Sequence, residues 1–444
     1  MSVELIAIFG LGIMFVIATV LPVNMGALAL AMAFIVGTTA VGMPSGDIMD
    51  GFPGGLFATL VGITYLFAIA RNNGTIDYIV HASVQAVRGR IALMPWVMFG
   101  ITGLLTAIGA VVPASVAIIA PIAMRFAVQY KINPLMMGLL VAHGAQAGSF
   151  SPISIFGGIT NGVVARAELP TGPFTIFLAS LLLNLGLALV LYVVMGGLAL
   201  RGKRAADMEQ AIDEEGNVIA EPVSVIGTGG TPAGYAPAGS KATGVQAERD
   251  HILTLCGLAI LAVAALGFGL DVGLVAITVA VILALLSPES QKGAVDKVSW
   301  STVLLVCGVT TYVGVMQEGG AIDFAGNSVA GIGSPLLAAL LLCYIGGIVS
   351  AFASTTGILG AIIPLAVPFL LQGNLSAIGV IAALGVASSV VDVSPFSTNG
   401  ALLVANAQGI DKEVFYRRLL AYGSFVVVFG PMIAWFFLVV TGWF

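Results

Sequence analysis

The sequence predicts an all-α membrane protein that crosses the bilayer many times and is built from two inverted repeats. Hydrophobic residues make up 59% of its 444 residues and charged residues only 8%, with a mean hydropathy of +1.09. Soluble domains carry about a quarter charged residues, so a soluble fold is excluded. Apolar runs near the ~20 residues that span a bilayer recur from end to end, and motifs of the first half return in the second.

Composition divides the chain into three parts. Residues 201–250 are first charged and then rich in Gly, Pro, Ala and Thr, which is typical of a solvated linker without a core. We therefore expect a first repeat at 1–200, a flexible cytoplasmic linker at 201–250 and a second repeat at 251–444. Apolar segments fall near 3–20, 25–43, 55–71, 91–110, 114–130, 135–148, 152–166 and 173–200, and again near 252–270, 272–288, 301–317, 334–351, 356–372, 376–391, 395–408 and 415–442.

Three pairs of motifs, found in the same order, indicate the duplication. "GITYLFAIARNNGTIDY" (62–78) aligns without a gap with "GVTTYVGVMQEGGAIDF" (308–324), 246 residues later. "VVPASVAIIAPIA" (111–123) aligns with "STTGILGAIIPLA" (354–366), and the phrase "SPIS" returns as "SPFS", each 243 residues later. Duplicated membrane halves with segments broken by Gly or Pro at matching places are typical of secondary transporters.

Each half is expected to contribute five spanning helices and one re-entrant hairpin, and an odd number of spans inverts the second repeat. With the N-terminus outside, fifteen of the sixteen Lys and Arg residues fall inside and only Arg166 falls outside. Acidic loops around Asp47, Asp50, Glu318 and Asp323 fall outside. We therefore predict a multi-pass protein of a bacterial inner membrane, in contact with lipid, with both termini periplasmic and the linker cytoplasmic.

The recurring phrase interrupts two apolar segments. Pro152 in "AGSFSPIS" (147–154) and Pro395 in "VVDVSPFSTNG" (390–400) remove a backbone donor and cannot continue the preceding turn. Non-helical backbone at membrane depth is tolerated only inside the protein or along a cavity. The freed carbonyls could hold sodium, and the exposed amides of each half-helix could hold an anion. For one segment, a proline kink with serines bonded to their own helix is the favoured alternative; two segments at matching places favour a binding site.

Two further apolar stretches are too long for one helix and too short for two spans with a loop. A re-entrant hairpin fits each, with its tip in "GAVVPASV" (109–116) or "FASTTGIL" (352–359), and each tip is expected to meet the broken segment of its own repeat. Hydroxyls at the second tip suit sodium and carboxylate oxygens, whereas the first tip relies more on backbone groups. Candidate substrate ligands are Pro113, Ala114, Ser115, Ser151, Ser154, Ser354, Thr355, Thr356, Ser397, Thr398 and Asn399, and candidate sodium ligands are Ser149, Ser151, Thr356, Asp392 and Ser394.

Ionisable residues at membrane depth are candidates for coupling. Asp392 adjoins the second break, where it ligates a cation, carries a coupling proton or caps a half-helix. His143 either senses substrate or proton or is a satisfied packing histidine, and the packing interpretation is favoured. Gln146 and Asn161 are candidates of lower weight for hydrogen bonds to substrate. Basic residues are absent from this region, so a bound anion needs amide dipoles, hydroxyls and a co-bound cation.

Motifs of enzymes are missing from the sequence. It contains no Walker loop, no HExxH and no pair of carboxylates in the apolar segments. The Gly-rich stretch "GGTPAGYAPAG" in the linker follows no predicted strand, which excludes a phosphate-binding loop. We therefore expect no enzyme, no nucleic-acid partner and no cofactor other than a coupling cation.

The N-terminal half resembles a known family of carriers. "LPVNMGALALAMAFIVG" (21–37) and "FPGGLFATLVGITYLFAIARNNGTIDYI" (52–79) resemble the MatC-type malonate and dicarboxylate carriers of the ion transporter superfamily, which are related to the divalent anion/sodium symporters. Those symporters carry a Ser-Asn-Thr hairpin tip ten residues before a Pro. Ser354-Thr355-Thr356 is similar to that tip, ten residues before Pro364 and with Thr replacing Asn, and Ser397-Thr398-Asn399 resembles a later phrase. Val111-Val112-Pro113 departs from the pattern.

The resemblance implies a substrate and a mechanism. It implies a homodimer in which a transport domain moves against a scaffold domain as an elevator, malonate or a C4-dicarboxylate such as succinate or malate as substrate, and coupling to sodium. We expect the first, second and last helices of each repeat to form most of the scaffold. The alternatives are the membrane subunit of a binding-protein-dependent organic anion transporter, a proton-coupled anion carrier and an ion channel.

Overall fold

The computed structural model describes residues 2–21, 23–86, 89–170, 172–204, 244–330, 334–352, 355–371 and 375–442. Within these ranges the protein is helical, and its β structure is limited to one isolated bridge between Arg90 and Arg204. Six of the described helices are long and apolar enough to cross a membrane, and shorter apolar helices accompany them. The predicted all-α membrane fold is thereby confirmed.

The first half follows the predicted order of elements. Its helices are α1 (Val3–Val20), α2 (Met25–Val36), α3 (Ser45–Asp50), α4 (Gly54–Asn72), α5 (Thr75–Ala86), α6 (Met94–Ala107), α7 (Val112–Gln129), α8 (Pro134–Gly148), α9 (Ile155–Arg166) and α10 (Pro173–Val194). A π-helical turn, η1 (Gly37–Val41), continues α2, and two short 3₁₀ turns are η2 (Ile91–Leu93) and η3 (Gly197–Leu200).

The second half repeats this order. Its helices are α12 (Gly244–Gly267), α13 (Val272–Leu286), α14 (Pro288–Gln291), α15 (Trp300–Glu318), α16 (Ala321–Ala330), α17 (Pro335–Phe352), α18 (Thr355–Leu371), α19 (Ala377–Val390), α20 (Thr398–Ala405) and α21 (Lys412–Trp435), which η4 (Phe436–Val440) extends. Each half thus has a hairpin (α6–α7 or α17–α18) and a broken helix (α8–α9 or α19–α20). α12 begins at Gly244, inside the stretch predicted as linker. Its first turns are polar, and for this reason they were not recognised as part of a membrane helix.

The two repeats hold each other through a pair of close helix crossings. α2 packs on α15, and the equivalent pair, α13 on α4, repeats the arrangement. A Cβ on Gly26 would lie 2.0 Å from the Leu304 carbonyl oxygen, and a Cβ on Gly308 would lie 2.1 Å from the Gly26 carbonyl oxygen. At the second crossing, a Cβ on Gly62 would lie 2.5 Å from the Gly273 carbonyl oxygen. Small residues allow membrane helices to approach this closely. We call the helices α1, α2, α4, α12, α13 and α15 the scaffold.

Replacing Gly308 with alanine is expected to destabilise the scaffold, because the new methyl group would overlap the backbone of α2. Overpacking of this kind costs typically about 1–3 kcal/mol. Gly314 is a matched control in the same helix, since the nearest atom to a Cβ there is the Gly51 Cα at 3.7 Å. Thermal denaturation of the purified variants in detergent measures the effect. Equal melting temperatures for Gly308→Ala and Gly314→Ala would contradict the close crossing.

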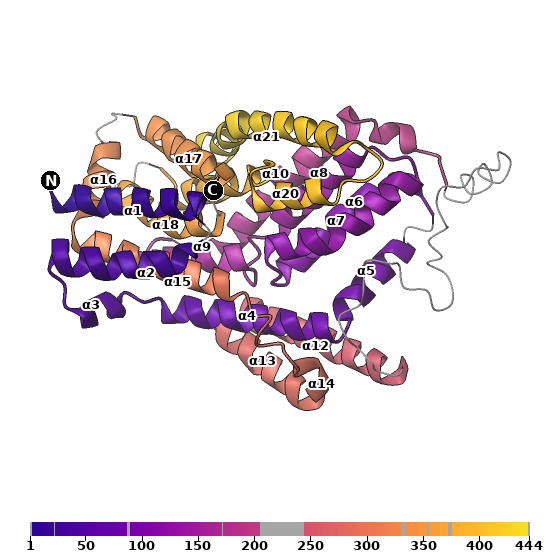
Figure 1. Cartoon of the computed structure of the whole chain (residues 1–444), viewed down its shortest axis with the longest axis horizontal. Helices are drawn as coiled ribbons and strands as arrows, with labels where there is room; N and C mark the ends of the chain where they lie inside the picture. The colour runs from indigo at the N-terminus through magenta and orange to yellow at the C-terminus, as the bar shows by residue number, and fades with distance from the viewer. Residues whose placement is uncertain are drawn as a thin grey trace.

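The hairpins and broken helices form a second group, the hairpin block, which comprises α6–α10 and α17–α21. α8 packs against both arms of the first hairpin and against α10, and α19 packs in the same way against α17, α18 and α21. Contacts between α10 and α19 join the two repeats within this block. Figure 1 shows the division, with α2, α4 and α13 below and α8, α10 and α21 above.

The last helix of each repeat lies in the hairpin block, so its expected place in the scaffold is wrong. Within the described residues, α10 and α21 have no packing on scaffold helices comparable to their packing on α8 and α19. α10 is largely apolar, and its buried polar residues Ser180 and Asn184 lie one turn apart on the side that faces α8. The sequence shows this polar pair but not which helix it faces, and this explains the wrong expectation.

Charged residues gather at opposite ends of the fold. Lys297 donates a hydrogen bond to the Asn72 side chain at the end of α4, where Asn73 also donates to Thr254 of α12 at 2.6 Å. At the other end, a Cβ on Gly320 would lie 3.9 Å from the Glu4 side chain. Figure 1 shows the N-terminus, α3 and α16 at one end and α5 toward the other. The acidic and basic loops that underlie the predicted orientation are therefore separated in space.

Candidate functional site

Both predicted breaks are present, and they share one hydrogen-bonding pattern. The Ser154 hydroxyl donates to the Ser151 carbonyl oxygen at 2.6 Å and accepts from the backbone N–H three residues later at 3.3 Å. In the second repeat the Ser397 hydroxyl donates to the Ser394 carbonyl oxygen at 2.7 Å and accepts from the corresponding N–H at 3.2 Å. These serines are the N-caps of α9 and α20. The duplicated phrase therefore ends one half-helix and starts the next.

A glycine in the first turn of each following half-helix packs against the break. A Cβ on Gly157 would lie 2.0 Å from the Ser151 carbonyl oxygen, and a Cβ on Gly400 would lie 1.9 Å from the Ser394 carbonyl oxygen. No real Cβ is found this close to a backbone atom. Only glycine lets backbone approach backbone in this way. The two glycines are 243 residues apart, which is the offset of the serines, so the repeat offset could have identified them from sequence.

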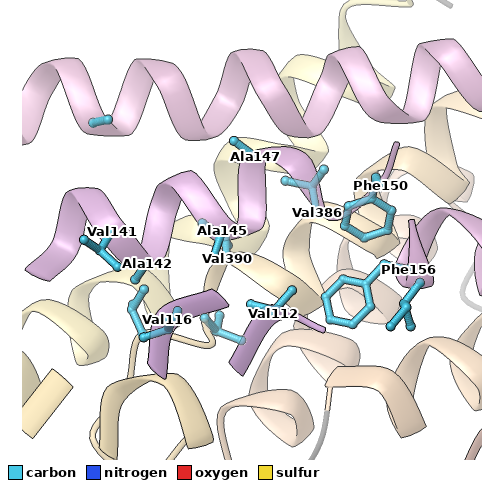
Figure 2. Close-up of a cluster of buried hydrophobic side chains, with 14 of the residues drawn as sticks. Val112, Val116, Val141, Ala142, Ala145, Ala147, Phe150, Phe156, Val386 and Val390 are labelled. Atoms are coloured by element: carbon cyan, nitrogen blue, oxygen red, sulfur yellow. The ribbon is translucent and has the colours of Figure 1, made fainter. Parts of the chain in front are cut away.

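The helices α8 and α19, which precede the two breaks, pack on each other in the apolar interior of the hairpin block. Phe150, within the first break, packs its ring against α19, 2.9 Å from the position of a Cβ on Gly385. Figure 2 shows Phe150 beside Val386 and Ala145 beside Val390. The second arm of each hairpin also crosses to the other repeat, since α18 packs on α9 and α7 packs on α20. Four interrupted or re-entrant elements thus converge on one region.

Each hairpin tip reaches the break of its own repeat. At the first tip Gly109 adopts a left-handed φ of +114°, and a Cβ there would lie 3.7 Å from the Ile153 carbonyl oxygen and 2.2 Å from Ile63 in the middle of α4. At the second tip the hydroxyls of Ser350 and Thr355 lie 2.9 Å apart. The Thr355 hydroxyl is also a hydrogen-bonding neighbour of the Asp392 carboxylate in the second break. Ser354 lies outside the described residues.

Asp392 is a buried carboxylate with polar neighbours, and it has no basic partner among the described residues. It accepts a hydrogen bond from the Asn399 side-chain amide at 2.8 Å and is a neighbour of the Ser397 hydroxyl and the Asn399 backbone N–H. The ion pairs found in the described ranges are both exposed and involve other acids. The Asn399 side-chain oxygen is buried and has no hydrogen-bond partner in the protein. A buried charge needs a partner, and a carboxylate beside amide and hydroxyl oxygens suits a cation.

The other predicted residues divide into groups. The hydroxyl of Ser149 donates to the Gln146 carbonyl oxygen at 2.7 Å, and those of Ser151 and Ser394 each accept a backbone N–H within the turn at 3.4 Å and 3.3 Å, so these three shape the breaks. Pro113 and Ala114 are half-buried in the first turn of α7, Thr356 is buried, and Thr398 is exposed. Ser115 is buried, and its hydroxyl has no partner in the protein.

His143 uses both ring nitrogens within the protein. Nδ1 lies 2.8 Å from the Asn184 side-chain oxygen, and Nε2 lies 2.6 Å from the Tyr422 hydroxyl. The amide oxygen can only accept, so Nδ1 carries the proton and Nε2 accepts from the tyrosine. This favours the packing interpretation over a coupling role. The sequence did not indicate these partners, because they stand 41 and 279 positions away in the chain.

A metal site built from several acidic, histidine or cysteine ligands is not found in the described part of the chain. The chemistry that the region offers is oxygen: hydroxyls at the second tip, the Asn399 side-chain oxygen and one carboxylate. Hard monovalent cations prefer such ligands. The N-termini of α9 and α20 meet the same region; the capping serines accept the N–H groups of Gly157 and Gly400, and the positive end of each half-helix favours an anion.

Comparison with known proteins agrees with this arrangement. Residues 1–149 match the family described as "Dicarboxylate carrier protein MatC N-terminus". The fold is similar to that of the Alcanivorax borkumensis YdaH transporter, with a TM-score of 0.63 and 11% sequence identity over 100% of this chain and 99% of that chain. A comparison with curated protein sequences found no significant match. The family match confirms the resemblance predicted from the sequence for residues 1–149, and the fold is one that a solved transporter also adopts.

Proposed function

We propose that the protein is a secondary active carrier that takes up a small dicarboxylate, such as malonate, succinate or malate, together with sodium. The observation that carries this proposal is the meeting of two broken helices, each with its own hairpin tip, around a buried carboxylate without a basic neighbour. The family match over the first third of the chain supports a dicarboxylate as the substrate. The fold shared with a transporter supports carriage across the membrane.

Two half-helices suit a ligand with two carboxylates. The N-terminal ends of α9 and α20 each present backbone N–H groups and a partial positive charge to the region between the breaks. Segments 107–116, 146–157, 350–356 and 389–400 contain no Lys or Arg. A dianion there would depend on these dipoles and on a co-bound cation, because an uncompensated charge is costly in a low dielectric. This dependence is the physical basis of coupling.

The sodium ligands we propose lie mostly in the second repeat. Asp392 supplies the negative charge, Asn399 an unpaired oxygen, and Thr355 and Thr356 hydroxyls at the hairpin tip. Ser149, Ser151 and Ser394 shape the breaks around this site, because each of their carbonyl oxygens already accepts two hydrogen bonds. The first tip has no hydroxyl in the positions of Thr355 and Thr356, so we expect it to bind substrate through Pro113, Ala114 and the unpaired Ser115 hydroxyl.

Unequal packing of the two repeats supports an elevator movement. α18 packs on scaffold helix α15 and on α16, whereas the equivalent α7 has no comparable packing on α4 and α5 in the described residues. Conversely α9 packs on α4, with Thr59 3.2 Å from the position of a Cβ on Gly158, and α20 has no comparable packing on α15. In the exchanged state α7 would pack on α4 and α20 on α15, while α18 would leave α15 and α9 would leave α4. The hairpin block would then lie at a different depth in the membrane relative to the scaffold. We propose that this exchange moves the site across the membrane of a homodimer, with the linker on the cytoplasmic side.

Uptake into proteoliposomes tests the proposal. Radiolabelled malonate or succinate is supplied outside while an inward sodium gradient or an inward proton gradient is imposed in turn. We expect saturable uptake that follows the sodium gradient. Uptake driven only by protons would contradict sodium coupling and assign Asp392 to proton transfer. No uptake under either gradient would contradict an autonomous carrier and favour a subunit that is supplied by a binding protein.

A further inference from the structure

Gln146 is a buried amide without partners. It lies in α8, three residues before the first break, and its side chain is fully buried. Neither its side-chain oxygen nor its nitrogen has a hydrogen-bond partner in the protein. Every other residue with an unpaired buried side-chain atom in the described part of the chain has one such atom, whereas Gln146 has two. An unpaired buried polar group is costly, and a native protein retains one mainly where it has a function.

The backbone of Gln146 is held firmly in place. Its carbonyl oxygen accepts from the Ser149 hydroxyl at 2.7 Å and from the Ser180 hydroxyl of α10 at 3.0 Å. Ser180 is itself joined to a buried chain, because its carbonyl oxygen accepts from Asn184 at 2.9 Å, and Asn184 accepts from His143. The chain ends at the tyrosine of α21 that donates to His143. Helices from both repeats therefore hold the backbone of α8 in place at Gln146.

Helical spacing places Gln146 on the side of α8 that carries His143, next to α21 and the second break. Residues three apart lie on the same side of a helix, so Gln146 follows His143 on the side of α8 that faces α21. α21 contacts the second break there, since a Cβ on Gly423 would lie 3.0 Å from the Ser394 Cα. A long side chain on this side of α8, three residues before the first break, can serve ligands of both repeats.

We propose that Gln146 binds the transported anion and the coupling cation together, with its N–H₂ group donating to a substrate carboxylate and its side-chain oxygen ligating sodium. This inference rests on the proposed function and adds a residue that links the two ligands. An amide is suited to the task because it has one donor group and one acceptor. In the absence of both ligands the two atoms are unpaired, and binding of both pairs them at once. Gln146 thereby makes the affinity for each ligand depend on the other.

Two substitutions separate the two atoms. Gln146→Met keeps the length of the side chain but removes donor and acceptor, so the KM for malonate and the half-saturating sodium concentration should each rise about tenfold or more, as expected for a lost buried hydrogen bond. Gln146→Glu keeps an oxygen ligand and removes the donor. The added negative charge also repels the substrate carboxylate and attracts sodium, so the KM for malonate should rise about tenfold while the half-saturating sodium concentration does not rise. Ser389→Ala is the control at the equivalent position of the second repeat, where the hydroxyl bonds its own helix at 3.2 Å.

Melting temperature without ligands distinguishes binding from a structural role. Gln146→Met removes two unpaired buried atoms, so its ligand-free melting temperature should equal or exceed that of the wild type. A lower melting temperature with unchanged KM and sodium dependence would overturn the inference, and so would wild-type kinetics in a stable variant. If Gln146→Met does not fold, unchanged KM in Gln146→Glu would overturn it equally. Lack of sodium-driven malonate uptake in the wild type would instead overturn the proposed function, and the inference with it.

Discussion

Replacing Gly400 with alanine is expected to reduce uptake at least about 100-fold, because misplacement of binding groups by about 1 Å can have an effect of this size. The added Cβ would lie 1.9 Å from the Ser394 carbonyl oxygen and 2.5 Å from the carbonyl carbon. Neither atom can move without opening the turn, since that oxygen accepts hydrogen bonds from both the N–H and the hydroxyl of Ser397. The break would lose the geometry that presents its carbonyls and amides to ligands.

The equivalent substitution in the first repeat should have the same effect. A Cβ on Gly157 would lie 2.0 Å from the Ser151 carbonyl oxygen, whereas one on Gly186 of α10 would have no atom within 4 Å. Uptake of malonate by Gly157→Ala, Gly400→Ala and the control Gly186→Ala, normalised to the amount of folded protein, measures the difference. Wild-type rates in either break variant would show that the geometry of that break is not needed for transport.

Replacing Asp392 with asparagine is expected to abolish the stimulation of uptake by sodium. The substitution keeps the size of the side chain and leaves an oxygen for the hydrogen bond from Asn399, which is 2.8 Å long in the wild type. What it removes is the negative charge that would offset a bound cation in a buried place. We expect the half-saturating sodium concentration to rise by more than about tenfold, as for the loss of a charged hydrogen-bonding partner.

Sodium titration of the initial uptake rate measures this change. Asp411→Asn is the control, because Asp411 is an exposed N-cap of α21 whose function asparagine can take over. Full sodium dependence in Asp392→Asn would leave Asp392 the role of a cap that holds Asn399 in place, and the cation site would have to be sought elsewhere.

The order of elements and both breaks could be predicted from the sequence, because duplication made weak signals specific. A single Pro-Ser phrase in an apolar segment is compatible with a simple kink, but Pro152 and Pro395 at a constant offset are not coincidental. The same offset relates the caps Ser154 and Ser397. Local chemistry determines these features: a missing donor ends one helix, and a hydroxyl caps the next.

The neighbours of each helix could not be predicted in the same way. In a membrane, most helices are apolar on all faces, so the pattern that reveals the buried face of a soluble helix is missing. Within the described residues α10 packs on α8 and α19, outside the scaffold where we expected it. Close contacts at Gly26 and Gly308 set the scaffold crossing, yet the chain has 57 glycines, and the sequence does not show which of them meet.

The roles of single polar residues depended on long-range contacts. His143 was a coupling candidate from its depth alone, and its partners Asn184 and Tyr422 became visible only in the fold. The sequence gives only weak support for a binding role of Gln146, because an isolated glutamine has no characteristic motif. Its importance follows from burial without partners, which is a property of the packed structure.

Equilibrium binding of malonate to the purified protein, measured over a series of sodium concentrations at constant ionic strength, tests the central claim most directly. If dicarboxylate and sodium share one region between the two breaks, each must raise the affinity for the other by the same factor, which is commonly about 5–150-fold. We predict such a reciprocal increase in the wild type and its loss in Asp392→Asn. Malonate affinity that is equal in sodium and in choline, or no malonate binding at all, would contradict the account.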